Sequence, residues 1–118
     1  MRRGDGTYVR ARSKLSGALR REIQATTHDH IQEVRRAIEV EAARLAARRA
    51  TAADLEACDV ALTARDEAAR RVERTAPEDD SWVDDWVEAD ARFHTALVAA
   101  AGNPLLLDLY LEIGSALR

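Results

Sequence analysis

The segment from residue 81 to residue 104 constrains the fold of this chain more than any other part. Read as a helix, the segment has an apolar stripe, which consists of Val83, Trp86, Val87, Phe93, Leu97 and Ala101. Asp90 and His94 are four residues apart and fall inside this stripe. A carboxylate or an imidazole without a partner is costly in an apolar interior. The sequence therefore predicts that both side chains have polar partners in the folded protein.

Composition and periodicity predict an all-α protein. The chain has 118 residues, enough for one small domain, and only 4% of them are aromatic. Good helix formers such as Ala, Leu, Arg and Glu are frequent. We expect an antiparallel helical bundle, with helices over residues 15 to 25, 27 to 49, 51 to about 76, 81 to 101 and 104 to 118.

Capping signals mark the ends of the predicted helices. Thr51 and Asp54 form a capping-box pattern, Gly102 is a natural C-cap, and Asn103-Pro104 provides an N-cap followed by a first-turn proline. The apolar residues between these signals recur at helical spacing. The predicted inner faces are Ile31, Val34, Ile38, Ala42 and Leu45, then Leu55, Cys58, Leu62, Ala69 and Val72, and finally Leu106, Leu109, Tyr110, Ile113 and Leu117.

Charge is distributed unevenly along the chain. Residues 1–25 contain seven basic and two acidic residues, a balance of +5, and the whole chain carries −3, so the remainder carries −8. A basic arm on an acidic body is compatible with contact to nucleic acid, for which Arg2 and Arg3 are weak candidates, although a short solvated tail is the commoner meaning.

Cysteine content and hydropathy indicate a cytoplasmic protein. Cys58 is the only cysteine, so it has no partner for an internal disulfide, and its place on a helical apolar face predicts a buried thiol. No apolar segment follows Arg2 and Arg3 as it would in a secretory signal, and no apolar run approaches the ~20 residues that cross a bilayer. We therefore expect no membrane partner.

The spacing of Asp90 and His94 admits two interpretations. Side chains four residues apart on a helix lie close enough to chelate one cation, but equally close enough to bond each other, and Asp90 has Arg92 or another helix as alternative partners. His28 and His30 are the other histidines of the chain, and we interpret them as an exposed helix start. The residues alone leave both interpretations of the pair open.

Two motifs resemble a known domain family. The first is Asp90-x-x-Phe93-His94-x-x-Leu97, followed by the sequence AAGNPLL at residues 100–106, and the second is EVRRAIEVEAARLAA at residues 33–47. Both resemble the effector-binding (FCD) domain of bacterial GntR-family transcription regulators of the FadR subfamily, in the same order. The resemblance covers residues 27 to 118 well and residues 1 to 14 loosely.

The resemblance implies a ligand-binding site. In the family, an Asp and a His matching Asp90 and His94 join two histidines from later helices to hold a divalent metal, often zinc or nickel. Those later helices would lie beyond Arg118, so we expect an incomplete site. The position of Arg35 in the family faces the pocket for a small organic acid effector; the alternative is an intrahelical pair with Glu39.

The resemblance also implies a domain organisation. Residues 1–14 would be a remnant of a winged-helix wing with a basic linker, or else a disordered arm, and residues 15–118 a partial effector-binding and dimerisation domain. Because the last predicted helix has no stop signal, we expect the chain to be cut within the fold. DNA would be bound only through a winged-helix domain missing from this chain, and the domain would form a homodimer.

No catalytic constellation is recognisable, so we do not expect an enzyme. The chain has no nucleophile elbow, no glycine-rich phosphate loop and no Cys-His pair at a familiar spacing. Besides effector sensing, the sequence permits a purely structural module, in which an uncovered apolar face on the last helix drives self-association. A metal-dependent enzyme is the third and weakest alternative.

Overall fold

The computed structural model describes residues 14, 16–74 and 80–116, and all regular structure in these residues is helical. The named helices are α2 (His28–Arg49), α3 (Ala52–Val72), α4 (Ser81–Ala100) and α5 (Pro104–Ala116). Residues 16–25 are also helical. The all-α prediction is confirmed. The expectation of a wing remnant over residues 1–14, with Arg2 and Arg3, falls outside the described residues except for residue 14, which is helical.

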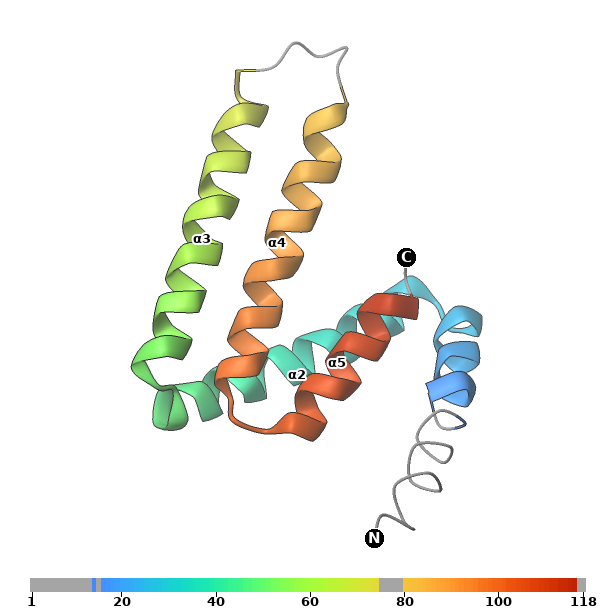
Figure 1. Cartoon of the computed structure of the whole chain (residues 1–118). Coiled ribbons are helices and arrows are strands. Elements are labelled where there is room, and N and C mark those ends of the chain that lie inside the picture. Colours follow the sequence, from blue (N-terminus) through green and yellow to red (C-terminus); the bar gives the residue numbers. More distant parts are fainter. Residues whose placement is uncertain (1–13, 15, 75–79, 117–118) are drawn as a thin grey trace, which may run out of the picture.

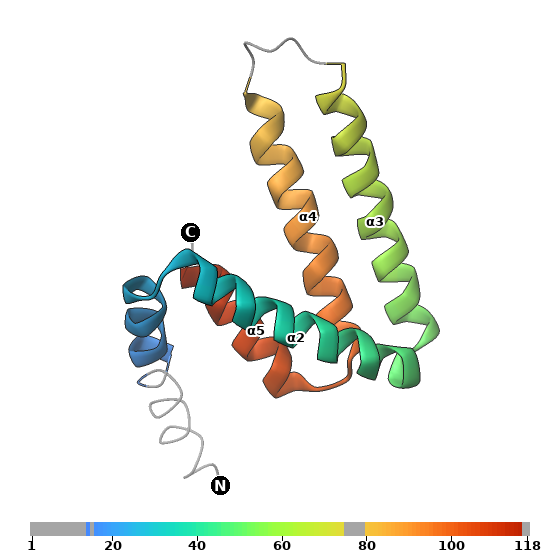
Figure 2. The same ribbon diagram turned by 180° about the vertical axis from the view of Figure 1, so that it is seen from behind.

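The helices form a long antiparallel hairpin with two further helices across one end. α3 and α4 run side by side along the hairpin, and α2 and α5 lie across its lower end (Figure 1). Seen from behind, α2 and α5 lie alongside each other (Figure 2). The predicted antiparallel bundle is therefore confirmed, but α2 and α5 cover only the part of the hairpin where α3 begins and α4 ends.

Local signals set the helix ends much as predicted. At the start of α3 the Thr51 hydroxyl accepts a hydrogen bond from the backbone nitrogen of Asp54 at 3.1 Å, and the Asp54 carboxylate accepts one from the backbone nitrogen of Thr51 at 3.0 Å. Gly102 follows α4 with a φ of +67°, and Asn103 accepts a hydrogen bond from the backbone nitrogen of Leu106 at 3.2 Å. The reciprocal capping box and the left-handed glycine are both confirmed.

The apolar core lies where α2, α4 and α5 meet. One cluster consists of Ala42, Val98, Ala101 and Tyr110, packed by Ile38, Leu45, Leu106 and Leu107. A second cluster consists of Ile23, Ile31 and Ile113, packed by Leu19 and Ile38. Because Ile38 contacts both clusters, they form one continuous core. This core joins the helical residues 16–25 to the three helices and leaves most of the hairpin outside it.

Several residues predicted to be internal are exposed. Leu55 on α3 and Val83 and Val87 on α4 are exposed, and so is Val34 on α2. The reason is that α3 packs mainly against α4, so a face that reads as apolar in the sequence need not have a partner helix. Cys58, which we predicted to be buried, is only half-buried.

The expectation of an uncovered apolar face on the last helix is wrong for its two central residues. Tyr110 and Ile113 are buried against the rest of the chain, and Leu106 packs on the same core. Leu109, which belongs to the predicted face, is exposed, and Leu105 and Leu111 are exposed outside that face. The sequence pattern identified the apolar face correctly, but α2, α4 and the helical residues 16–25 cover its central part. Leu117 lies outside the described residues.

Among the described helices none is long and apolar enough to cross a membrane.

The turn between α4 and α5 gives the first testable prediction. We expect Gly102→Ala to lower the free energy of unfolding by about 1 to 2 kcal/mol, because a residue with a Cβ is strained at positive φ. The space itself is adequate, since an added Cβ would lie 3.6 Å from the Cδ atom of Arg49. Denaturant unfolding of the purified variant measures the effect.

Gly114 provides the matched control within the same chain. It lies inside α5, and an added Cβ would meet nothing within 4 Å. Gly114→Ala should therefore stabilise the protein by roughly 0.5 to 1 kcal/mol through helix propensity. Equal effects of the two substitutions would contradict the role given to the backbone conformation of Gly102.

Candidate functional site

Six polar side chains form a continuous chain of contacts across four helices, which we call the polar chain. Its members come from α3, α4, α2 and α5, and in spatial order they are Arg65, Asp90, His94, Glu39, Tyr110 and Arg35. The polar chain begins within the α3–α4 hairpin and ends at α2 beside the apolar core. Every residue that we predicted as a metal or effector ligand belongs to it.

Asp90 is paired with an arginine of the neighbouring helix. The Nε atom of Arg65 donates to Asp90 Oδ1 at 2.7 Å, and the guanidinium lies 5.9 Å from the centroids of both the Trp86 and the Phe93 rings. Arg92, the partner considered from sequence, donates instead to Glu88 at 3.3 Å. Of the alternatives for Asp90, the structure therefore has the bond to another helix.

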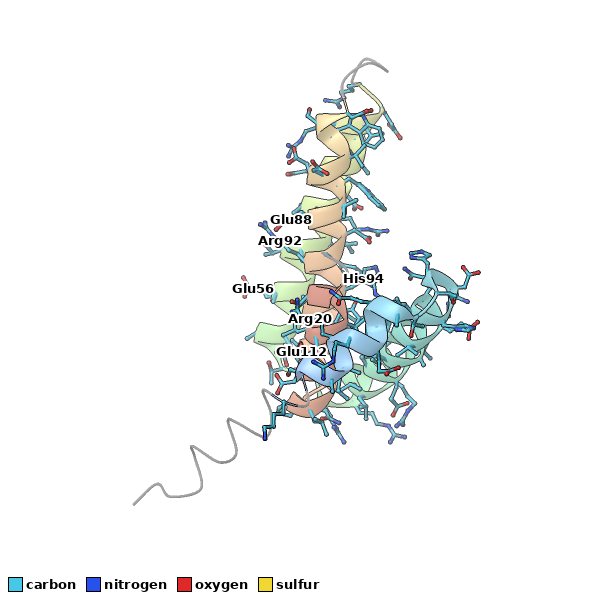
Figure 3. The ribbon with its side chains drawn as sticks, turned by 90° about the vertical axis from the view of Figure 1, so that its right-hand side faces the viewer. Arg20, Glu56, Glu88, Arg92, His94 and Glu112 are labelled. Carbon is cyan, nitrogen blue, oxygen red and sulfur yellow. The ribbon has the colours of Figure 1, made fainter. Side chains whose placement is uncertain are left out.

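His94 lies between two carboxylates. Its Nε2 atom is 3.5 Å from Asp90 Oδ1, and its Nδ1 atom is 3.5 Å from Glu39 Oε1. Figure 3 shows His94 on the side of α4 that faces α2, whereas Glu88 and Arg92 lie on the other side. The Nδ1 atom is buried, and no group in the described residues completes a hydrogen bond with it. The imidazole therefore has unused binding capacity.

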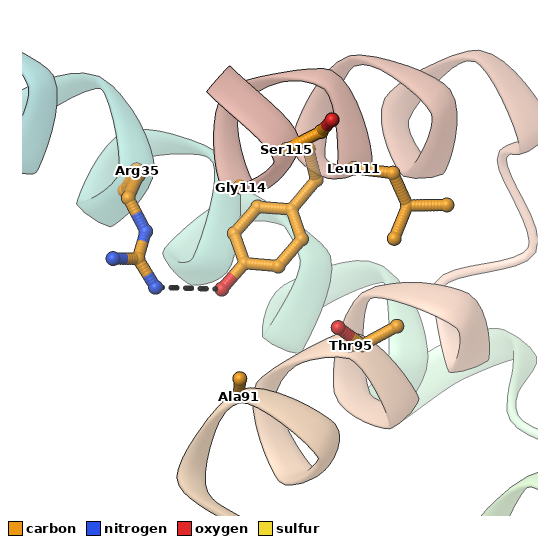
Figure 4. A pocket seen from close by; sticks show the side chains of 7 residues that line it. Arg35, Ala91, Thr95, Leu111, Gly114 and Ser115 are labelled. Carbon is orange, nitrogen blue, oxygen red and sulfur yellow. Dashed lines mark hydrogen bonds between the residues drawn. The ribbon is translucent and has the colours of Figure 1, made fainter. Parts of the chain in front are cut away.

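Tyr110 links the carboxylate of Glu39 to the guanidinium of Arg35. The Tyr110 hydroxyl donates to Glu39 Oε1 at 2.6 Å. It accepts from Arg35 Nη2 at 3.2 Å, the bond drawn as a dashed line in Figure 4. Burial, together with the negative charge of Glu39, raises the pKa of Tyr110 to about 12, although Arg35 acts in the opposite direction. Arg35 also lies 3.8 Å from Glu39. Both sequence interpretations of Arg35 thus have a structural counterpart, because it contacts Glu39 and also faces a cavity.

The cavity lies between α4 and α5, with Arg35 of α2 at its edge, and has a volume of about 350 Å³. Its polar lining residues are Arg35, Thr95, Tyr110 and Ser115, and its other walls are formed by Ala91, Leu111 and Gly114 (Figure 4). The Ser115 hydroxyl accepts a hydrogen bond from Arg20 Nη2 at 2.6 Å. The volume lies at the small end of the range for small-molecule sites. One guanidinium with three hydroxyls suits a small anion.

The two predicted metal ligands, Asp90 and His94, are separated by a distance that two ligands of one ion can span, but the described residues offer no third ligand. Two ligands about 2.1 Å from a tetrahedral metal are roughly 3.4 Å apart, and the separation of His94 Nε2 and Asp90 Oδ1 is 3.5 Å. However, Asp90 Oδ1 already accepts a hydrogen bond from Arg65. Within the described residues no group of three or more His, Cys, Asp or Glu side chains is placed to hold a metal ion.

The remaining histidines and the cysteine lie outside the polar chain. His28 and His30 are exposed at the start of α2, as predicted, and the His28 ring is 3.4 Å from the amide of Gln32. Burial, followed by the nearby charges of Asp54 and Asp59, raises the pKa of the Cys58 thiol. A raised pKa makes this thiol a weak nucleophile at neutral pH.

Sequence reasoning missed Arg65, the contacts of Glu39 with His94 and Tyr110, and the role of Tyr110 itself. Arg65 carried a usable signal, because it falls between Leu62 and Ala69 at helical spacing and so occupies a position on the predicted inner face of α3. A charged residue on an inner face requires a partner, and Asp90 is the corresponding charge on α4. Which helix faces which was not evident from the pattern, so the pair was not predicted.

Comparison with known proteins gives one match. The FCD domain matches residues 29–118, which include α3, α4, α5 and nearly all of α2. No curated protein and no solved structure matches the chain. The matched region contains every residue of the polar chain and of the cavity.

The raised pKa of Tyr110 is directly measurable. The chain has two tyrosines, so in a Tyr8→Phe variant the tyrosinate absorbance near 295 nm reports Tyr110 alone. We expect a midpoint of about 12, compared with about 10 for a free tyrosine. A midpoint near 10 would contradict the burial and the bond to Glu39.

The same shift fixes the sign of a pH effect on stability. The pKa of Tyr110 is higher in the folded chain than in the unfolded chain, so its contribution to the free energy of unfolding is complete below pH 10. That contribution is lost as the pH rises from 10 towards 12, because Tyr110 then ionises in the unfolded chain while it stays protonated in the folded chain. Two pKa units correspond to about 3 kcal/mol at most. Unfolding measured at rising pH should therefore show a steeper decline for the unaltered chain than for Tyr110→Phe.

Proposed function

The chain belongs to the FCD domain family, the effector-binding C-terminal domain of GntR/FadR-type regulators, and we propose that it senses a small organic acid as part of a bacterial transcription regulator in the cytoplasm. The observation that carries the proposal is the cavity lined by Arg35, inside the matched region. The FCD domain is a regulatory rather than a catalytic family, in keeping with the prediction that the chain is not an enzyme.

Arg35 is the proposed anchor for the effector carboxylate. A guanidinium binds a carboxylate through two parallel hydrogen bonds, and Arg35 uses one Nη atom for Tyr110. Thr95 and Ser115 add hydroxyls from α4 and α5, so an effector held in the cavity would contact three helices at once. A volume of about 350 Å³ favours a compact acid over a long acyl chain.

A divalent metal, zinc or nickel, is the proposed second element of the site. Asp90 and His94 would supply two ligands, and the fit of their 3.5 Å separation supports this assignment. Such a metal adds positive charge that attracts the effector carboxylate. A bound metal needs further ligands, because the described residues offer no third ligand group.

Effector binding would act by favouring one packing of the helices. The cavity is bounded by α2, α4 and α5, and the polar chain connects Arg35 at its edge to Arg65 on α3. A ligand that contacts Arg35 competes with its existing partners Tyr110 and Glu39 and thereby alters the contacts between α2 and α5. In this proposal the change passes through a homodimer to a winged-helix domain, which contacts the DNA.

The alternative function is a helical association module without a ligand, derived from such a regulator. Leu105 and Leu109 favour self-association in either case, because both are exposed and lie one turn apart on α5. The two functions differ in ligand binding. A chain that self-associates but binds no carboxylate would be the helical association module.

Thermal unfolding with a panel of small mono- and dicarboxylates tests the sensing function. We expect at least one acid to raise the melting temperature by several degrees, because a ligand that binds only the folded state stabilises it by mass action. Arg35→Gln should weaken that binding at least tenfold through loss of a charge-assisted bond.

Arg44→Gln is the matched control for the carboxylate panel. Arg44 lies on the same helix and is exposed, and its guanidinium bonds to Glu41 outside the cavity. With this substitution, the acids should raise the melting temperature by as much as they do in the unaltered chain. No response of the unaltered chain to any acid would favour the association module.

Elemental analysis of the purified chain tests the metal. We expect near-stoichiometric zinc or nickel that is lost in His94→Ala, since removal of one of two protein ligands should abolish binding. His30→Ala is the control, because His30 is exposed at the start of α2. Metal-free protein that folds equally well with and without His94 would remove the metal from the proposal.

A further inference from the structure

We propose that the cavity between α4 and α5 selects an acid with two carboxylates, and that Arg20 at its rim binds the second of them. The inference rests on the proposed function in one respect, namely that the cavity binds an organic acid at Arg35. It adds the chemical class of the ligand, a dicarboxylate, and a residue that determines this specificity. Arg20 lies in the helical residues 16–25, before residues 29–118, which match the FCD domain.

Arg20 is connected to the cavity by Ser115. The Nη2 atom of Arg20 donates to Ser115 Oγ at 2.6 Å, and Ser115 is one of the residues that line the cavity. The helical residues 16–25 are held against α5, because Ile23 packs in one buried cluster with Ile113. A guanidinium has several N–H donors, and the bond to Ser115 uses one of them. A ligand group that contacts Ser115 is therefore within reach of the remaining donors of Arg20.

The positive charge of Arg20 has no counter-ion within the described residues. Its hydrogen-bond partner there is a neutral hydroxyl, and no described carboxylate forms an ion pair with it, whereas Arg35 lies 3.8 Å from Glu39. The carboxylate of a ligand would supply the missing negative charge through a charge-assisted hydrogen bond. Because the Arg20 side chain is exposed, solvent screens this interaction, and we expect an effect on affinity of about tenfold.

Arg35 and Arg20 act at two separate points of the cavity. Arg35 donates to the hydroxyl of Tyr110, and Arg20 donates to that of Ser115. Both hydroxyls belong to α5, and their spacing of five residues corresponds to about 7.5 Å along a helix axis. Apart from Arg35 the lining residues are uncharged, and an added Cβ at Gly114 would meet nothing within 4 Å (Figure 4). This arrangement suits a compact acid with a carboxylate at each end.

A purely structural role is the alternative for Arg20. Ser115 lies in the last turn of α5, where a nearby cation also interacts favourably with the negative end of the helix dipole. Loss of such a role would lower the stability of the chain. It would not change the preference of the cavity for one acid over another, so this preference is the property to measure.

Isothermal titration calorimetry with matched pairs of acids tests the inference. Succinate and butyrate have the same carbon number and differ by one carboxylate, and glutarate and pentanoate form a second such pair. We expect the unaltered chain to bind the dicarboxylate of at least one pair about tenfold more tightly than its monocarboxylate partner. In Arg20→Gln this preference should disappear through weaker binding of the dicarboxylate, with the affinity for the monocarboxylate unchanged.

Two further substitutions complete this measurement. Arg35→Gln should weaken the binding of both members of a pair, because Arg35 binds the carboxylate that they share. Arg21→Gln is the matched control, since Arg21 is the next residue of the same helical segment and is also exposed. With this substitution the preference for the dicarboxylate should equal that of the unaltered chain.

Reversal of the charge at Arg20 gives a test that a structural role cannot imitate. In Arg20→Glu the preference should change from succinate to 4-aminobutyrate, which keeps one carboxylate for Arg35 and carries an ammonium group at its other end. The unaltered chain should prefer succinate over 4-aminobutyrate, because Arg20 repels the ammonium group.

The outcomes separate this inference from the proposed function. Equal affinities of the unaltered chain for both members of each pair would overturn the inference and leave the sensing of an acid in place. A preference for the dicarboxylate that persists in Arg20→Gln, or an equal loss of affinity for both acids in that variant, would also overturn it. Absence of binding by every acid to the unaltered chain would overturn both the inference and the sensing function.

Discussion

The buried side chain of Tyr110 fixes how α5 lies against α2 and α4. Its ring belongs to the apolar cluster with Ala42, Val98 and Ala101, and its hydroxyl belongs to the polar chain. A buried hydroxyl without a partner is costly, so α5 has to sit where Glu39 can accept its hydrogen bond. This single side chain thereby aligns the apolar core with the polar contacts. The cavity that Tyr110 helps to line is a consequence of the same alignment.

The polar chain specifies an arrangement more than it adds stability. Its ion-paired side chains are between 23% and 34% exposed, so solvent weakens each charge pair. These contacts instead determine how the side chains and their helices are placed, because each joins a group on one helix to a nearby group of complementary charge or hydrogen-bonding character. The exception is His94 Nδ1, which is buried and has no hydrogen-bond partner among the described residues.

The sequence predicted local features well because their causes are local. The capping box at Thr51 and the left-handed Gly102 depend on residues within one turn, and the all-α class depends on composition and period. Exposure of Leu55 and Val87 was mispredicted for a different reason. A helical stripe shows which face is apolar, but whether another helix covers that face depends on the tertiary arrangement.

The candidate site was predictable only in part for the same reason. Asp90, His94 and Arg35 were found from spacing and family resemblance, and the structure brings them into one chain of contacts. Arg65, the partner of Asp90, and Glu39, the partner of His94, come from other helices, and Arg65 and Asp90 are 25 residues apart in the sequence. Such pairs are fixed by how helices face one another. A charged residue on an inner face requires a partner, but its position in the sequence does not identify that partner.

The asymmetric placement of the core gives the hairpin the mechanical character of a lever. The apolar clusters hold α4 at its C-terminal end, and the N-terminal half of α4 contacts α3 with exposed Val83 and Val87 on its surface. α4 has 20 residues, and a helix of that length spans roughly 30 Å, so a tilt of about 5° at the base would displace the far end by roughly 2.6 Å. A rearrangement too small to disturb the core would thus be magnified at the distal end of the hairpin.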